Sequence, residues 1–261
     1  MSYLRLISTF IKVNLQMSLA YRSEAVVEIL LDFIWLAWEL VSLQIIFSNT
    51  ESLGGWGRGE VIALLGVLLM VNTFMAMLIW PNTEKFNASV RDGSFDYMLL
   101  QPVNSMFLVT FSRITVWRLL DLIISIALIV IGININGDVV TPFNIFMFIL
   151  LALSGSMVIY SLWIVLIAFT FWFTKFDNNV TILQALTDTG RYPATVYPWW
   201  LRVIVTFVIP IALATTIPIQ ALRGDLDINQ IGIFFGVSML SLVIASQVWR
   251  VGVKRYSGAS S

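Results

Sequence analysis

The sequence predicts an all-α polytopic membrane protein, in which an N-terminal interfacial amphipathic helix precedes six transmembrane helices. Of its 261 residues, 59% are hydrophobic and only 11% are charged, whereas about a quarter of the residues in a soluble domain are charged. The mean hydropathy is +0.89. Six segments also reach the length of roughly 20 apolar residues that a spanning helix needs.

The first element is the N-terminal helix, which we expect over residues 1–22. Arg5, Thr9 and Lys12 recur at helical spacing, and apolar residues fill the other face. That pattern is typical of a helix lying in the membrane interface. The transmembrane helices are expected at 25–47, 61–80, 114–133, 143–173, 200–222 and 231–249. All seven belong to a single transmembrane domain covering residues 1–261.

The basic residues predict the orientation. With six spans, 13 of the 15 lysines and arginines fall on the side of the two termini, and only Arg58 and Arg223 fall on the other. Cytoplasmic loops carry an excess of Lys and Arg. We therefore expect both termini in the cytoplasm, and a multi-pass protein of the bacterial plasma (inner) membrane.

The first span carries an acidic stripe. Glu24, Glu28, Asp32 and Glu39 lie within an arc of about 80° on one helix face. Ionisable groups inside a membrane are rare and usually paired or water-facing. Glu28, Asp32 and Glu39 are therefore candidates for a translocation path or a partner interface. Structural pairing with Arg113, Arg118 or another helix is an equally good explanation.

The predicted fifth span contains two prolines. Pro210 and Pro218 each remove a backbone donor, so the sequence predicts kinks that could act as hinges. In the sixth span, Gly232 and Gly236 have the spacing of a close helix contact, which apolar helices often show by chance.

The segment 83–102, after the second span, is expected on the cytoplasmic side. Residues 83–91 can form a short helix that ends at Gly93. An apolar group follows, from Phe95 to Leu100, and Pro102 ends it. An exposed apolar group needs cover. It packs either on the membrane interface or into a groove of another protein.

Several function classes are excluded or disfavoured. The chain has no histidine and no cysteine, which removes His-ligated metals, thiol nucleophiles and the usual triads. Zero net charge gives no electrostatic support for nucleic-acid binding. No phosphate-binding Gly-x-x-x-x-Gly-Lys-Ser/Thr motif occurs. We expect no catalytic residues, no cofactor and no metal, so any ATP would be hydrolysed by another polypeptide.

Taken together, these features resemble the ABC type-2 family of transporter permeases, in its short six-span bacterial branch. The resemblance is carried by Arg-Asp-Gly-Ser-Phe-Asp-Tyr-Met-Leu-Leu-Gln-Pro-Val at 91–103, Gly-Arg-Tyr-Pro at 190–193, Pro210 and the ending Lys-Arg-Tyr-Ser-Gly-Ala at 254–259. It covers essentially the whole chain. A longer re-entrant hairpin between the last two spans is common in such permeases. Here that loop spans only about 223–230, which argues against such a gate. Extra interfacial or re-entrant helices within 174–200 are the alternative.

The resemblance implies a permease subunit of an ATP-driven exporter. Its partners would be ABC ATPase subunits and a second permease chain, identical or related, within a lipid bilayer. The segment 83–102 would be the coupling helix that enters the ATPase. The coupling residues would be Glu84, Lys85, Arg91, Asp92, Phe95, Asp96, Tyr97, Met98 and Leu99. An ion-coupled secondary transporter that uses the acidic stripe is the alternative, although no matched pair of interrupted helices supports it.

The predicted orientation can be tested by cysteine labelling, because the chain has no native cysteine. In intact cells an impermeant thiol reagent should label Asn49→Cys, and should reach Ser257→Cys only after permeabilisation. The reverse pattern would overturn the orientation.

Overall fold

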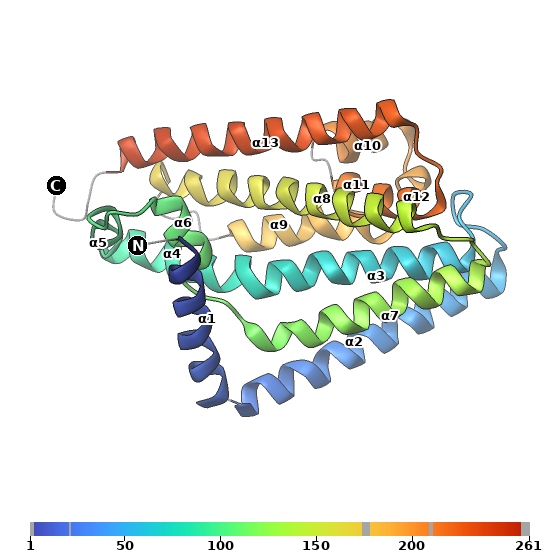
Figure 1. The fold of residues 1–261 in the computed structure, drawn as a ribbon, viewed down its shortest axis with the longest axis horizontal. Helices are drawn as coiled ribbons and strands as arrows, with labels where there is room; N and C mark the ends of the chain where they lie inside the picture. The colour runs from blue at the N-terminus through green and yellow to red at the C-terminus, as the bar shows by residue number, and fades with distance from the viewer. Residues whose placement is uncertain (1–2, 21, 174–177, 209–210, 257–261) are drawn as a thin grey trace.

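The fold is a bundle of long helices with α1 lying across one end (Figure 1). The computed structural model describes residues 3–20, 22–173, 178–208 and 211–256. The longer helices are α1 (Tyr3–Ala20), α2 (Arg22–Asn49), α3 (Arg58–Phe74), α4 (Trp80–Asp92), α7 (Leu119–Asn136), α8 (Pro142–Ala168), α9 (Asn179–Asp188) and α13 (Ile228–Arg255). The shorter ones are α5 (Phe95–Leu99), α6 (Ser105–Phe111), α10 (Trp199–Val203), α11 (Ile211–Ala214) and α12 (Thr216–Arg223).

Within the described residues, five helices are long and apolar enough to span a membrane. They cover Ala25–Asn49, Arg58–Asp92, Val116–Asn136, Pro142–Phe171 and Asn229–Arg255. The all-α membrane class is therefore confirmed, but six continuous spans are not found. The two ends of the bundle are called here the α1 end, which also holds α4 and α5, and the loop end, which holds the α2–α3 connection.

The second span does not stop at Trp80 as predicted. The helix continues from Arg58 to Asp92 through a π-helical turn at Met75–Ile79. Pro81 has no N–H, so the carbonyl of Met77 lacks its usual helical donor. The backbone N–H of Thr115 donates to that oxygen instead, at 2.9 Å. The proline is thus accommodated without ending the helix.

The predicted fifth span, 200–222, is wrong as a single helix. Its described parts are α10, a π-helical turn at Ile204–Val208, α11 and α12. Thr195 donates to the carbonyl of Gly54, and Arg202 donates to the carbonyls of Ala194 and Thr195. This segment therefore begins at the loop end.

The same segment also returns to the loop end. Arg223 pairs with Glu60 at 2.9 Å and lies over the Trp56 ring. Between its two ends, the chain packs in the middle of the bundle, where a Cβ atom on Gly155 of α8 would meet Leu213. Residues 199–223 thus enter and leave at one end, as a re-entrant segment does.

The preceding segment connects the two ends in place of the predicted span. Asn179, at the start of α9, exchanges 3.2 Å hydrogen bonds with Asn87 of α4 at the α1 end. Thr195 already lies at the loop end. Arg202 consequently joins Arg58 and Arg223 there, which weakens the predicted charge asymmetry without reversing it.

Helices α3 and α7 pack closely against each other. A Cβ atom on Gly132 would meet the carbonyl oxygen of Gly59, and would lie 2.6 Å from the backbone nitrogen of Ala63. Gly232 and Gly236, in contrast, have nothing within 4 Å of their Cβ positions. Within this chain, the close contact is made by these glycines of α3 and α7.

This difference predicts opposite effects of two Gly→Ala changes. Gly132→Ala should lower the free energy of unfolding by roughly 1–3 kcal/mol, since backbone atoms must move to admit the methyl group. Gly232→Ala should be neutral or stabilising, because alanine favours the helix by about 1 kcal/mol. Thermal unfolding in detergent measures both. Equal effects would contradict the proposed packing.

Candidate coupling segment and intramembrane charges

The predicted coupling segment forms an elbow of two helices. α4 ends at Gly93, which adopts the left-handed conformation with φ 78°, and glycine does this without steric cost. The carboxylate of Asp92 accepts a 2.8 Å hydrogen bond from the backbone N–H of Ser94. The five-residue α5 follows directly. Because α4 is continuous with α3, this elbow is the end of a long rigid helix.

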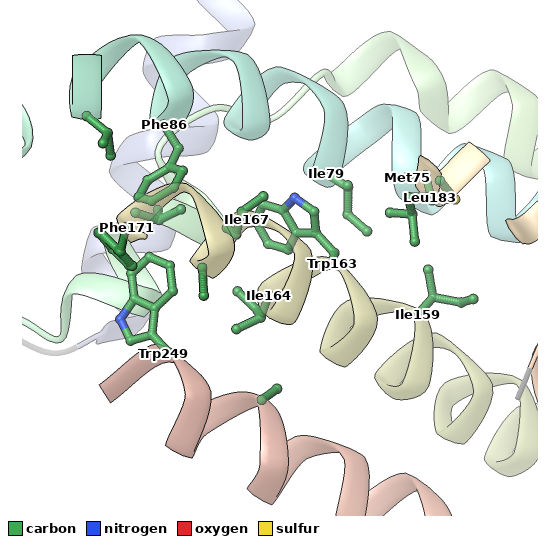
Figure 2. Packing of buried hydrophobic residues seen from close by; sticks show 14 of the residues in the cluster. Met75, Ile79, Phe86, Ile159, Trp163, Ile164, Ile167, Phe171, Leu183 and Trp249 are labelled. Carbon is green, nitrogen blue, oxygen red and sulfur yellow. The ribbon is translucent and has the colours of Figure 1, made fainter. Parts of the chain in front are cut away.

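A docking residue is expected to face outward, but Phe95 does not. Its side chain is fully buried, with ring centroids 5.4 Å from Phe86, 5.5 Å from Phe171 and 5.3 Å from Tyr256. Phe86 and Phe171 also approach Trp249 of α13 (Figure 2). Phe95 therefore anchors α5 to α4, to α13 and to the turn Phe169–Phe171 that follows α8, through an internal aromatic cluster.

The outward-facing apolar residues of the elbow are Tyr97, 72% exposed, and Leu100, 81% exposed. Leu99 is less exposed, and Met98 packs against the aromatic cluster. The other members of the predicted set divide by position. Glu84, Arg91 and Asp92 are exposed, Asp96 is half-buried, and Lys85 is half-buried beside α1.

Asn82 holds the base of the elbow, and sequence reasoning missed it. Its side chain is 1% exposed. The amide nitrogen donates to the carbonyls of Thr110 and Arg113, and the amide oxygen accepts from the Arg113 N–H at 2.9 Å. The signal that could have revealed it is an amide directly after a proline in an apolar helix. Asn82 thereby fixes the 110–113 turn onto α4.

The three candidate carboxylates of the acidic stripe, Glu28, Asp32 and Glu39, are paired. Arg118 contacts Glu28 at 3.0 Å, Asp121 at 3.1 Å, and Asp32. Trp117 also donates its indole N–H to Glu28. Arg118 was one of the two named candidate partners; the other, Arg113, makes no ion pair in the described part of the chain. Three carboxylates from α2 and α7 thus share one guanidinium, whose side chain is only 14% exposed.

Glu39 has a different partner. Arg191 contacts it at 2.8 Å, and also lies 3.8 Å from Asp188. Asp32, Glu39, Arg118 and Arg191 line one cavity of about 470 Å³. The described residues contain no group of three or more His, Cys, Asp or Glu side chains placed to hold a metal ion. The stripe therefore combines structural pairing with exposure to an internal space.

Of the two prolines proposed as hinges, the structure describes only Pro218. Pro210 lies outside the described residues. Pro218 is in the first turn of α12, where no intrahelical donor is needed. The break in this segment lies at Thr215, with φ −122° and ψ −68°.

A family model described as an ABC-2 family transporter protein matches residues 33–260. The chain belongs to the ABC-2 transporter family. This match confirms the resemblance. It covers the elbow and the re-entrant segment, and of the acidic stripe it includes Glu39. ABC-2 permeases are typically non-catalytic membrane subunits that partner with an ABC ATPase. No curated protein and no solved structure matches the chain.

The shared guanidinium predicts a strong effect of Arg118→Gln. Breaking a buried ion pair costs about 3 kcal/mol or more, because the charge left behind stays buried. Asp121 is the most buried of the three carboxylates, at 8% exposure. Adding Asp121→Asn should therefore restore part of the lost stability.

Thermal unfolding in detergent checks the pair of variants. Arg58→Gln is the matched control, since Arg58 is exposed and makes no ion pair in the described part of the chain. An Arg118→Gln protein as stable as this control would show that the cluster is not structural.

Proposed function

We propose that this ABC-2 protein is the permease subunit of an ATP-driven exporter, with ATP hydrolysed by separate ABC ATPase subunits. Two permease chains, identical or related, would form the path between them. The α1 end would face the cytoplasm of a bacterial cell, in keeping with the basic residues that remain there. Closure of the ATPases would move the elbow and switch access to the path.

The observation that carries this proposal is the mechanical connection of the elbow. α5 is held by Phe95, whose neighbours Phe171 and Trp249 belong to the ends of two other long helices. α4 continues into α3 through the π-helical turn. A displacement of α5 would therefore be transmitted to α3, α8 and α13 together, while Tyr97 and Leu100 remain exposed to receive a partner.

The acidic stripe supports a path wall more than ion coupling. Asp32 and Glu39 line the cavity of about 470 Å³, and each forms an ion pair with an arginine. A carboxylate that is paired with a guanidinium must first lose that ion pair before it can bind a cation or a proton. The pairing therefore speaks against the secondary-transporter alternative.

Replacing the two exposed residues should weaken ATPase binding. Tyr97→Ala with Leu100→Ser removes apolar anchors without touching the aromatic cluster, so affinity should fall by roughly tenfold or more. Co-purification of the ATPase and the ATP hydrolysis rate of the complex measure the effect. The control is Val139→Ser, an 88% exposed residue of the α7–α8 connection at the loop end. Unchanged binding in a normally expressed double variant would contradict the docking role.

Phe95→Ala should act differently, because Phe95 is internal. The variant should lose stability by roughly 3–5 kcal/mol, and ATP hydrolysis should become uncoupled from transport in any complex that still assembles. Reduced ATPase binding with unchanged unfolding temperature would place Phe95 at the docking surface after all.

A further inference from the structure

A second cavity, of about 560 Å³, lies between α1 and the bundle. One face of α1 lines it with Phe10, Val13 and Met17, and the bundle contributes Lys85 and Arg113. It belongs neither to the elbow surface nor to the cavity of the acidic stripe, because none of its lining residues lines the other cavity.

The cavity is basic and uncompensated. Neither Lys85 nor Arg113 forms an ion pair with any residue in the described part of the chain, and no Asp or Glu appears among the residues lining the cavity. Trp117, which lines the cavity, donates to the carboxylate of Glu28, but that carboxylate is already bound by Arg118 as well. Two cations that share a cavity repel each other unless an anion joins them.

The backbone that carries the two cations is also held in place. Arg113 is fixed through both its backbone N–H and its carbonyl by Asn82. Lys85 lies one turn beyond Asn82 on the same helix, and Asn14 of α1 donates to the carbonyl of Ser112 at 3.5 Å. The backbone positions that carry the two cations are thus fixed by the buried amide of Asn82 and by α4.

The other wall is apolar and open. Val13 is 42% exposed and Met17 60% exposed, on a helix whose amphipathic pattern is that of the membrane interface. An occupant must therefore carry a negative charge at one end and apolar chains at the other. Basic pockets beside membrane helices recognise anionic lipid headgroups in this way.

We propose that this cavity binds the phosphate headgroup of an anionic phospholipid from the leaflet at the α1 end. The phosphate lies between Lys85 and Arg113, and the acyl chains run along Val13 and Met17. The bound lipid bridges α1 to the base of the elbow, so it stabilises the position of α1 relative to α4.

Native mass spectrometry of the full chain in detergent tests this proposal, by titration with phosphatidylglycerol and with phosphatidylcholine of the same acyl chains. The wild type should bind phosphatidylglycerol more tightly. Each cation near an anionic lipid contributes about fivefold in affinity, so Lys85→Gln with Arg113→Gln should weaken binding by roughly 25-fold.

Two further variants keep the test decisive if the neutral variant folds poorly. Lys85→Arg with Arg113→Lys keeps both charges and should retain the preference. Lys254→Gln with Arg255→Gln removes two exposed cations from the same end of the bundle. This change should leave the preference for phosphatidylglycerol unchanged.

Three outcomes would overturn the proposal. One is equal loss of phosphatidylglycerol binding in the neutral pocket variant and in the Lys254 and Arg255 control. The second is the absence of any preference over phosphatidylcholine. The third is binding of inorganic phosphate alone, with the same dependence on Lys85 and Arg113 and without lipid, which would identify free phosphate as the ligand.

Discussion

Hydrocarbon offers no hydrogen-bond partner, so a polar group between the two ends of this bundle must find one within the protein. Most of the architecture follows from that constraint. Arg118 satisfies Glu28, Asp32 and Asp121 together. Serine and threonine hydroxyls donate to the backbone carbonyl one turn earlier, as Thr73 does to Leu69. At the irregular turn before Pro81, a neighbouring segment supplies the missing partner.

The junction of α3 and α4 shows the same rule at work near the elbow. Pro81 removes a donor, and the Thr115 N–H replaces it at Met77. Asn82 then binds the backbone of the neighbouring turn through both ends of its amide. The result is a long helix that carries a proline yet stays continuous, with the chain after α6 fastened to its side. In the proposed mechanism, such a junction would transmit motion from the elbow into the bundle.

The α1 end therefore combines three structural devices in one place. An aromatic cluster ties α5 to α13 and to Phe171, just after α8. Asn82 ties the 110–113 turn to α4, and α1 lies beside that turn with a basic cavity between them. The loop end is built differently, from Arg223 on Glu60 and from the re-entrant segment. In the proposed mechanism, a motion that starts at the elbow would reach the loop end through α3, α8 and α13.

The sequence by itself determined the membrane class, the ABC-2 resemblance and most of the long helices, because apolar length and loop charge are local properties of the chain. It also pointed to Arg118 as a partner of the acidic stripe, since an intramembrane charge demands one. Only the tertiary structure decided that Phe95 lies inside and Tyr97 outside, that 199–223 turns back to the loop end, and that Gly59 and Gly132 make the close contact. Each of these depends on which helices are neighbours, and an apolar residue has the same hydropathy whether it meets lipid or another helix.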